Sequence, residues 1–527
     1  LAFSSATALM TWPLWQQWLK EHRPGFKPED YWRATWGALD QAKLRPEASA
    51  EAAAEKPRLY VDSTVFYEDV SIAFVAGGAK AVRDAFGEDV LTGCNWSGYP
   101  FYYPHSVQYV KWFRGGAADY GKHSEYFWEL GQVTPLINGY ISEHFRAGTR
   151  FNPRAMIIQY NMPHSPGNTD ADFRRTAFTH LAHGCKGLDF FGIGMNETFT
   201  ENHIDHRDHG RFIAVRDITH SIGLIEELLE QSQVVPSEVA LLVSESTERW
   251  DHAKVATDQL VKGQPARQFR QDRLTYHQER VGIYSALTFA GYGVDMVVEE
   301  DLLNPKVLGG YKALFVVGDC LPVEAVPALE QWVKAGGLLV ATAGAGRFDT
   351  YRAPNPAMQA LLGIGQRQLE ERETFLRTSQ ELPFIRPISM VVSAPVTMPE
   401  AVVGGTQPYL QPTVLGNVWQ FSALAIHERI TPAAGAGVLA RFAPEGTMES
   451  APAVITRSAD KGRVIYVAAL PGIAYLWTGL QPPVVPDRGP GVHRAVNTYD
   501  RGAAAFLTSV LRQANLIDCE PRGVWLF

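Results

Sequence analysis

Residues 155–193, AMIIQYNMPHSPGNTDADFRRTAFTHLAHGCKGLDFFGI, decide the fold, because an apolar run, an amphipathic helical pattern and a second apolar run follow one another there. Further apolar runs begin near residues 90 and 117, and each is followed by a helical pattern. Strand starts near 90, 117, 155 and 188 are one β–α unit apart. This spacing predicts parallel strands joined by right-handed crossovers.

The spacing alone fits both an open doubly wound sheet and a (β/α)8 barrel. The strand ends favour the barrel, because barrel enzymes assemble their sites where the carboxyl ends of the strands converge. Each apolar run here finishes in polar or aromatic residues: Asn95-Trp96, His123 to Tyr126, Gln159 to Asn161, and Asn196-Glu197. Since four strands are visible, we expect the C-terminal half of a TIM barrel.

A second α/β unit is predicted after residue 234. Its strand patterns lie at 238–244, 294–298, 313–318 and 338–342, with helices at 283–290 and 323–335 between them. Glycines follow the helix ends, as C-caps would. This order is typical of a flavodoxin-like parallel sheet. Three later strands and a helix are expected at 438–442, 453–456, 463–468 and 502–514.

Composition excludes several function classes. The 527-residue chain is 46% hydrophobic and carries a net charge of −8 without a long basic stretch, which argues against a nucleic-acid binder. No apolar run approaches the roughly 18 residues that would cross a membrane. Four scattered cysteines predict neither a zinc site nor a disulfide framework. We expect no cofactor and no metal. The signal region lies outside the visible chain, which leaves the compartment open, with the cytoplasm as the default expectation.

Three segments resemble the β-galactosidases of glycoside hydrolase family 42. Residues 174–194, RRTAFTHLAHGCKGLDFFGIG, look like the last helix and strand of that family's barrel. Residues 312–346, KALFVVGDCLPVEAVPALEQWVKAGGLLVATAGAG, resemble the middle of its trimerisation domain, which has a class I amidotransferase-like fold. Residues 434–468, AGAGVLARFAPEGTMESAPAVITRSADKGRVIYVA, resemble the closing strands of that domain. The likeness spreads over most of the chain.

The predicted domain organisation follows from these patterns and the resemblance. Residues 1–57 are expected to form a helical segment of the barrel and a linker. Residues 58–232 would form the C-terminal half of the barrel. Residues 233–527 would form an amidotransferase-like domain with a Gly/Pro-rich insertion at about 350–430. Cys320 does not make this domain a glutaminase, because the Gly-x-Cys-x-Gly elbow that such an enzyme needs is incomplete here.

The resemblance implies a retaining glycosidase, but both catalytic positions raise questions. The family's acid/base Glu would lie just upstream of Leu1, together with the first four strands. The family's nucleophile position corresponds to Gln159, and an amide cannot form a covalent glycosyl intermediate. Three readings stay open. Gln159 is an engineered change from Glu, or a different carboxylate acts, or else the protein binds sugar without hydrolysing it or the alignment at this position is shifted.

Glu125 is the preferred alternative carboxylate. It follows the sixth strand of the expected barrel among aromatic residues, which could desolvate it and raise its pKa. Alternatively, Glu125 binds a sugar hydroxyl or pairs with a neighbouring base. Asp119 is interpreted as a structural ion-pair partner.

The remaining candidates are expected to bind substrate. Indole rings stack on pyranose faces and amides bridge hydroxyls. The substrate-binding candidates are Asn95, Trp96, Tyr160, Asn161, Glu197 and His203. The leading hypothesis is therefore a glycoside hydrolase acting on a β-linked, galactose-like sugar, working as a homotrimer or another homo-oligomer. The rival is a non-catalytic carbohydrate-binding or assembly subunit with the same fold.

Overall fold

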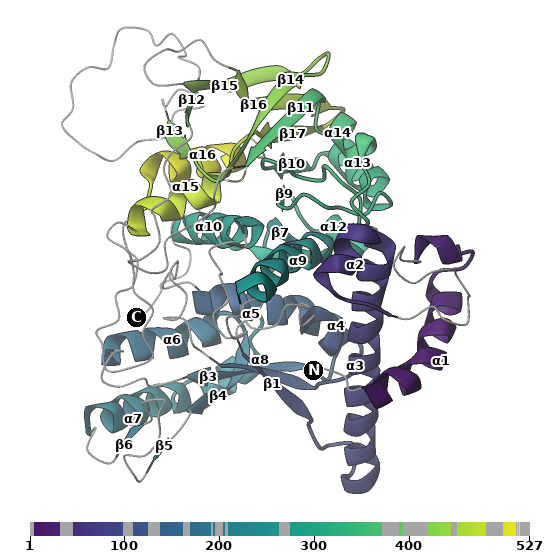
Figure 1. Cartoon of the computed structure of the whole chain (residues 1–527). Helices are drawn as coiled ribbons and strands as arrows, with labels where there is room; N and C mark the ends of the chain where they lie inside the picture. The colour runs from purple at the N-terminus through teal and green to yellow at the C-terminus, as the bar shows by residue number, and fades with distance from the viewer. Residues whose placement is uncertain are drawn as a thin grey trace, which may run out of the picture.

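The computed structural model describes residues 5–31, 46–97, 109–124, 137–161, 169–190, 193–194, 204–205, 209–262, 275–371, 389–393, 419–443, 451–480, 499–512, 514 and 516. It is an α/β structure with two main sheets (Figure 1). Within these ranges, no helix combines the length and the apolar character that crossing a bilayer requires.

The first sheet has four parallel strands in the order β1-β2-β3-β4. The strands are β1 (Gly93–Ser97), β2 (Tyr120–Ser124), β3 (Met156–Asn161) and β4 (Cys185–Phe190). The connections contain α4 (Tyr109–Arg114), α5 (Ile137–Thr149) and α6 (Asp170–Ala182). This confirms the strand order predicted from the β–α spacing, since each strand pairs with the next one along the chain.

Four helical segments precede this sheet: α1 (Ser5–His22), η1 (Pro28–Asp30), α2 (Ala50–Glu55) and α3 (Pro57–Phe86). The side chain of Ser49 caps α2 by accepting a hydrogen bond from the Ala52 N–H. Pro57 begins α3, where its missing N–H costs nothing, and Gly87 ends it with a φ of 104°. After β4 come β5 (Ile193–Gly194), β6 (Ile204–Asp205), α7 (His209–Gly223) and α8 (Glu226–Gln231).

The second sheet has nine strands in the order β13-β12-β15-β16-β17-β10-β9-β7-β8. Its parallel part comprises β7 (Val239–Val243), β8 (Asp295–Val298), β9 (Ala313–Val316), β10 (Leu338–Ala341) and β17 (Gly462–Val467). The antiparallel part comprises β12 (Ser389–Ser393), β13 (Gln420–Ala423), β15 (Gly437–Ala443) and β16 (Pro452–Ala459). The strands predicted to form a parallel sheet, β7, β8, β9 and β10, do pair in parallel, and the later strands, whose direction was not predicted, make the whole sheet mixed. The later strands extend it at one edge.

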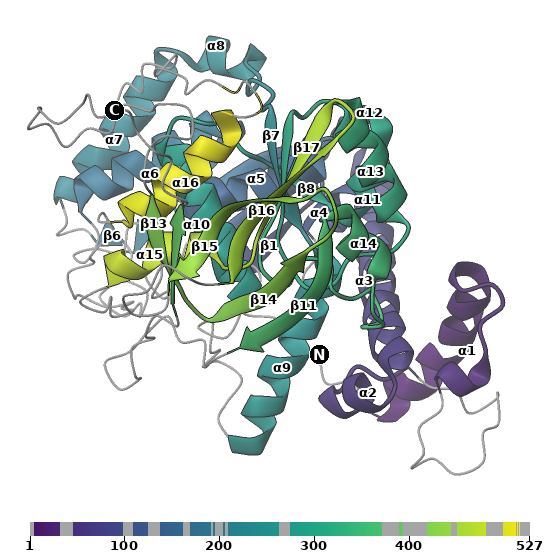
Figure 2. The same cartoon turned by 90° about the horizontal axis from the view of Figure 1, so that it is seen from above.

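The remaining elements surround this sheet (Figure 2). They are α9 (Glu245–Lys262), α10 (Thr275–Phe289), α11 (Glu299–Leu302), α12 (Pro305–Leu308), α13 (Ala325–Ala335), α14 (Pro356–Leu361), α15 (Pro471–Trp477), η6 (Thr478–Leu480) and α16 (Arg501–Arg512). A two-stranded antiparallel ribbon, β11 (Ile364–Glu371) with β14 (Ile426–Pro432), lies beside them.

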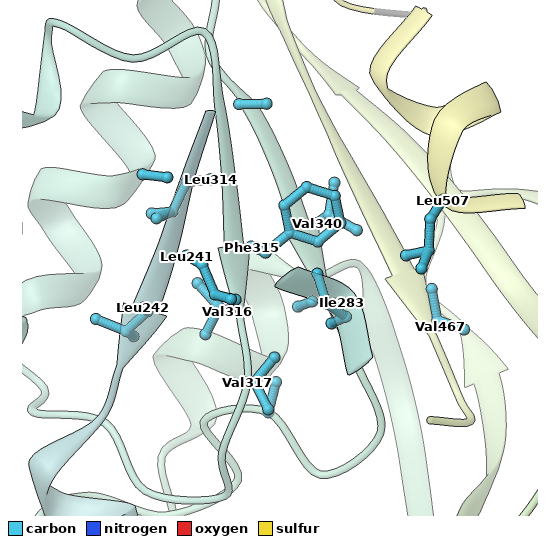
Figure 3. Packing of buried hydrophobic residues seen from close by; sticks show 14 of the residues in the cluster. Leu241, Leu242, Ile283, Leu314, Phe315, Val316, Val317, Val340, Val467 and Leu507 are labelled. Carbon is cyan, nitrogen blue, oxygen red and sulfur yellow. The ribbon is translucent and has the colours of Figure 1, made fainter. Parts of the chain in front are cut away.

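The main core lies on the second sheet. Every residue of β7, β8, β9 and β10 is buried, which is the pattern of parallel strands covered on both faces. Figure 3 shows Leu241, Phe315 and Val340 of this sheet near Ile283 of α10. These apolar runs were recognisable as buried strands because they contain no polar alternation.

Ion pairs join the two parts of the chain. The Arg146 guanidinium of α5 lies 3.2 Å from the Asp295 carboxylate of β8. Arg249 of α9 pairs with Glu68 of α3 at 2.9 Å, and both side chains are buried. Helix α5 contacts both β3 and β8, so it lies between the two sheets (Figure 1). The first sheet is therefore supported on one face by a helix layer that it shares with the second sheet.

Candidate active site

The two faces of β3 differ in burial. Ile157, Gln159 and Asn161 are buried, whereas Met156, Ile158 and Tyr160 keep part of their surface exposed. Successive side chains of a strand point to opposite faces. One face of the sheet therefore meets the helix layer, and the other face carries the alternate residues.

Gln159 and Asn161 face the helices. The Gln159 amide donates a hydrogen bond to Ser142 Oγ of α5 at 3.3 Å. The Asn161 amide donates to the carbonyl of Phe173 in α6, also at 3.3 Å. Both side chains are fully buried. This differs from the expectation that Gln159 is the nucleophile position and that Asn161 binds substrate, because strand alternation turns both side chains into the sheet–helix interface.

A β-bulge in β4 sets the orientation of Asp189. On β3, Ile157 and Ile158 are consecutive, but their partners on β4 are Cys185 and Gly187. The extra residue on β4 reverses the subsequent alternation of side chains between the two faces.

Beyond the bulge, Leu188 and Phe190 pack against the apolar cluster formed by α6 and α7. The intervening Asp189 therefore faces the other side of the sheet, beside its register partner Tyr160.

Asp189 is the residue that sequence reasoning missed. The four strand sequences, GCNWS, YGKHS, MIIQYN and CKGLDF, contain no other acidic residue. The signal was the sequence Leu188-Asp189-Phe190, in which one acidic residue separates two apolar residues.

Two predicted binding residues lie on β1. The side chain of Asn95 is exposed, while its neighbour Cys94 packs against the main core, so Asn95 faces away from the helices. Trp96 is paired in backbone register with His123 of β2. Glu125, Glu197 and His203 lie outside the described residues.

Asp119 has the structural role that the sequence predicted. Its carboxylate pairs with Arg83 and Arg154, each at 3.2 Å, at the amino-terminal end of β2. Burial acts to raise the pKa of Asp119, but hydrogen bonds from Thr92 and Arg154 outweigh it and lower the pKa. An ionised carboxylate held by two arginines at this end of the sheet serves the fold.

Cys320 lies in a buried position after β9. Its thiol donates to the Asp319 carboxylate at 3.4 Å, and burial together with that negative charge raises its pKa well above the ordinary value. A nucleophilic cysteine needs the opposite shift. The environment of Cys320 therefore agrees with the rejection of glutaminase chemistry.

An open polar cleft of about 590 Å³ lies on the second part of the chain, at α14 and the β11–β14 ribbon. It is lined by Gln359, Gly365, Gln366, Arg367, Gln368, Arg429, Ile430 and Thr431. None of the predicted site residues that the structure describes lines it.

The chain matches no protein-family model and no curated protein, but it resembles solved structures. The β-galactosidase from Bacillus circulans sp. alkalophilus superposes with a TM-score of 0.64 at 16% identity, covering 95% of this chain and 65% of that one. The β-galactosidase from Halorubrum lacusprofundi gives a TM-score of 0.64 at 16% identity, with coverages of 97% and 67%. A catalytic mutant of Gan42B, a GH42 β-galactosidase from G. stearothermophilus, gives 0.60 at 16% identity, with coverages of 87% and 63%.

At this identity the comparison establishes the fold. The chain has a GH42-like fold, which it shares with β-galactosidases, and it spans 65% of the length of the Bacillus circulans enzyme. Fold by itself does not assign an activity, since one fold hosts many chemistries.

Proposed function

We propose that this chain is part of a retaining glycoside hydrolase that acts on a β-linked, galactose-like glycoside. In this proposal residues 1–57 form a helical segment of the barrel and a linker, residues 58–232 form the C-terminal half of a TIM barrel, and residues 233–527 form an amidotransferase-like domain. The fold shared with β-galactosidases supports the proposal, because it makes glycoside hydrolysis the first chemistry to test.

One observation carries the proposal. Asn95, Tyr160 and Asp189 lie on the face of a parallel sheet that is turned away from its helices. Tyr160 and Asp189 are each the next-to-last residue of their strand. The carboxyl ends of parallel strands are where α/β enzymes bind their ligands. Amide, phenol and carboxylate groups are suited to binding sugar hydroxyls.

A second candidate is a non-catalytic carbohydrate-binding or assembly subunit. Retaining hydrolysis needs two carboxyl groups about 5–5.5 Å apart. The four strands of the first sheet offer one carboxylate, Asp189, and Gln159 is a neutral amide turned into the helix layer. Glu125 stays the proposed second carboxylate, with Glu197 and His203 as proposed sugar-binding residues.

The proposed assembly is a homotrimer or another homo-oligomer in which the second part of the chain makes the subunit contacts. Light scattering of the full-length protein tests it. A strict monomer would count against this part of the proposal.

The decisive experiment assays the full-length protein on a panel of nitrophenyl α- and β-glycosides and, in parallel, measures sugar binding by calorimetry. Hydrolysis of a β-galactoside with retained configuration would support the hydrolase. Sugar binding without turnover would support the second candidate. Neither turnover nor binding across the panel would refute both.

A further inference from the structure

The bulge in β4 has a specific effect on the chemistry of the sheet. Counting alternation forward from Cys185, which is buried with Ile157, would turn Asp189 into the helix layer. The extra residue at the bulge turns it to the opposite face instead. Bulges next to sites commonly re-aim one side chain in this way. Here the re-aimed side chain is the sheet's one carboxylate.

Tyr160 lies beside Asp189 on the same face of the sheet. It is the direct register partner of Asp189, and neighbouring strands lie about 4.8 Å apart, so the two side chains begin side by side on the same face. One step toward the amino-terminal end, the same face carries Ile158 and Gly187. A Cβ at Gly187 would lie 3.2 Å from the Ile158 side chain, so Ile158 extends over the glycine. The Ile158 side chain therefore forms an apolar surface next to Asp189 and Tyr160.

We propose that Asp189 and Tyr160 form a sugar-binding subsite in which the Asp189 carboxylate accepts hydrogen bonds from neighbouring hydroxyls of a neutral pyranoside. The Tyr160 ring packs partly against the main core, its exposed part contacts the sugar, and this inference rests on the proposed function. A carboxylate is the strongest acceptor that a side chain can offer to a pair of hydroxyls, and an aromatic ring beside it covers the apolar C–H face. Because a carboxylate repels a phosphate group, we expect the sugar that binds at Asp189 to carry no phosphate.

The test compares Asp189→Asn with wild type in the full-length protein, using the nitrophenyl glycoside that wild type hydrolyses best. We expect kcat/KM to fall about ten- to two-hundredfold, the loss typical of one charge-assisted hydrogen bond. For Tyr160→Ala, kcat/KM should fall by about tenfold or more. The matched control is Asp217→Asn, the same substitution on α7, where Asp217 pairs with Arg174 at 2.7 Å. Circular dichroism and the thermal midpoint verify folding.

Deoxy substrates separate contact from structure. Removing the hydroxyl that Asp189 binds should weaken kcat/KM more in wild type than in Asp189→Asn, because the neutral amide oxygen is the weaker acceptor. If the wild-type protein binds sugars without turnover, dissociation constants replace kcat/KM. They are compared between wild type and Asp189→Asn, each with the parent sugar and with its deoxy analogue. A loss below threefold in Asp189→Asn, or identical deoxy effects in both proteins, overturns the subsite while leaving the proposed function standing. A wild-type protein that neither hydrolyses nor binds any sugar overturns both.

Discussion

The backbone N–H of Glu299 donates a hydrogen bond to the carboxylate of Glu245 at 3.1 Å, where β7 and β8 end. The Glu299 carboxylate in turn accepts from Ser244 Oγ at 2.8 Å and from the Ser246 N–H at 3.0 Å. Burial raises the pKa of both carboxyl groups, and the charge of Glu299 adds to the shift that brings the pKa of Glu245 to about 7. Two buried carboxylates so close together favour retaining a proton.

This pair predicts a pH-dependent stability. The folded-state pKa of Glu245 lies above its ordinary value of 4.5, so its contribution is fully present below that value and is lost as the pH rises through about 7. Glu245→Gln should therefore gain stability relative to wild type between pH 5 and pH 8.5, by at most about 3 kcal/mol. Urea unfolding across this range measures it.

The control is Glu330→Gln on α13, an exposed carboxyl whose pKa is lowered by its hydrogen bond to Lys334. The difference in unfolding free energy between Glu330→Gln and wild type should stay constant over the same pH range. A constant difference for Glu245→Gln as well would contradict the prediction.

The buried ion pair between α3 and α9 should be costly to break. Arg249 lies 2.9 Å from Glu68, and Lys111 lies 3.6 Å from the same carboxylate. Removing one member leaves an uncompensated buried charge, so Glu68→Gln should cost about 3–5 kcal/mol of unfolding free energy. Arg249→Met should lower the unfolding free energy much less in the Glu68→Gln variant than in the wild-type protein. Strict additivity in this double-mutant cycle would disprove the coupling. Asp84→Asn, which breaks the exposed Lys80 pair, is the control and should change almost nothing.

Gln159→Glu should destabilise the protein rather than activate it. Its carboxylate would be buried against Ser142 in the helix layer, so the loss should be about 1–3 kcal/mol and larger at pH 7 than at pH 4. Gln159→Met is the control, because it keeps the side-chain volume but introduces no titratable group. Its loss of unfolding free energy should not depend on pH. The measurement is urea unfolding with a parallel glycosidase assay. New hydrolytic activity in the Glu variant would show that residue 159 meets the substrate after all.

Two glycines should respond oppositely to alanine. A Cβ at Gly282 of α10 would lie 2.1 Å from the carbonyl oxygen of Gly472 in α15, so Gly282→Ala forces the helices apart and should cost about 1–3 kcal/mol or more. A Cβ at Gly77 in α3 meets nothing within 4 Å, so Gly77→Ala should gain about 0.5–1 kcal/mol by stabilising the helix. Thermal unfolding of both variants compares them directly. Equal shifts would refute the close-packing argument.

Much of the fold could be read from local patterns. The β–α spacing predicted four neighbouring parallel strands, and the apolar runs located β7, β8, β9 and β10. Boundaries were less accurate. The sequence predicts a long helical pattern from residue 65 to 86, but helix α3 already begins at Pro57, and its first turns are buried against other parts of the chain. The mixed character of the second sheet was not predictable, since strand direction depends on which edge a distant segment joins.

For the site, the sequence by itself determined which strands carry polar ends and placed Asn95 and Tyr160 among the candidates. The tertiary structure decided which way the side chains point. Gln159 turned into the helix layer, and Asp189 turned to the opposite face through one extra residue in β4. The physical reason is the two-residue period of a strand, in which a single inserted residue exchanges the two faces. Such an insertion is defined only by hydrogen-bonded register with the neighbouring strand.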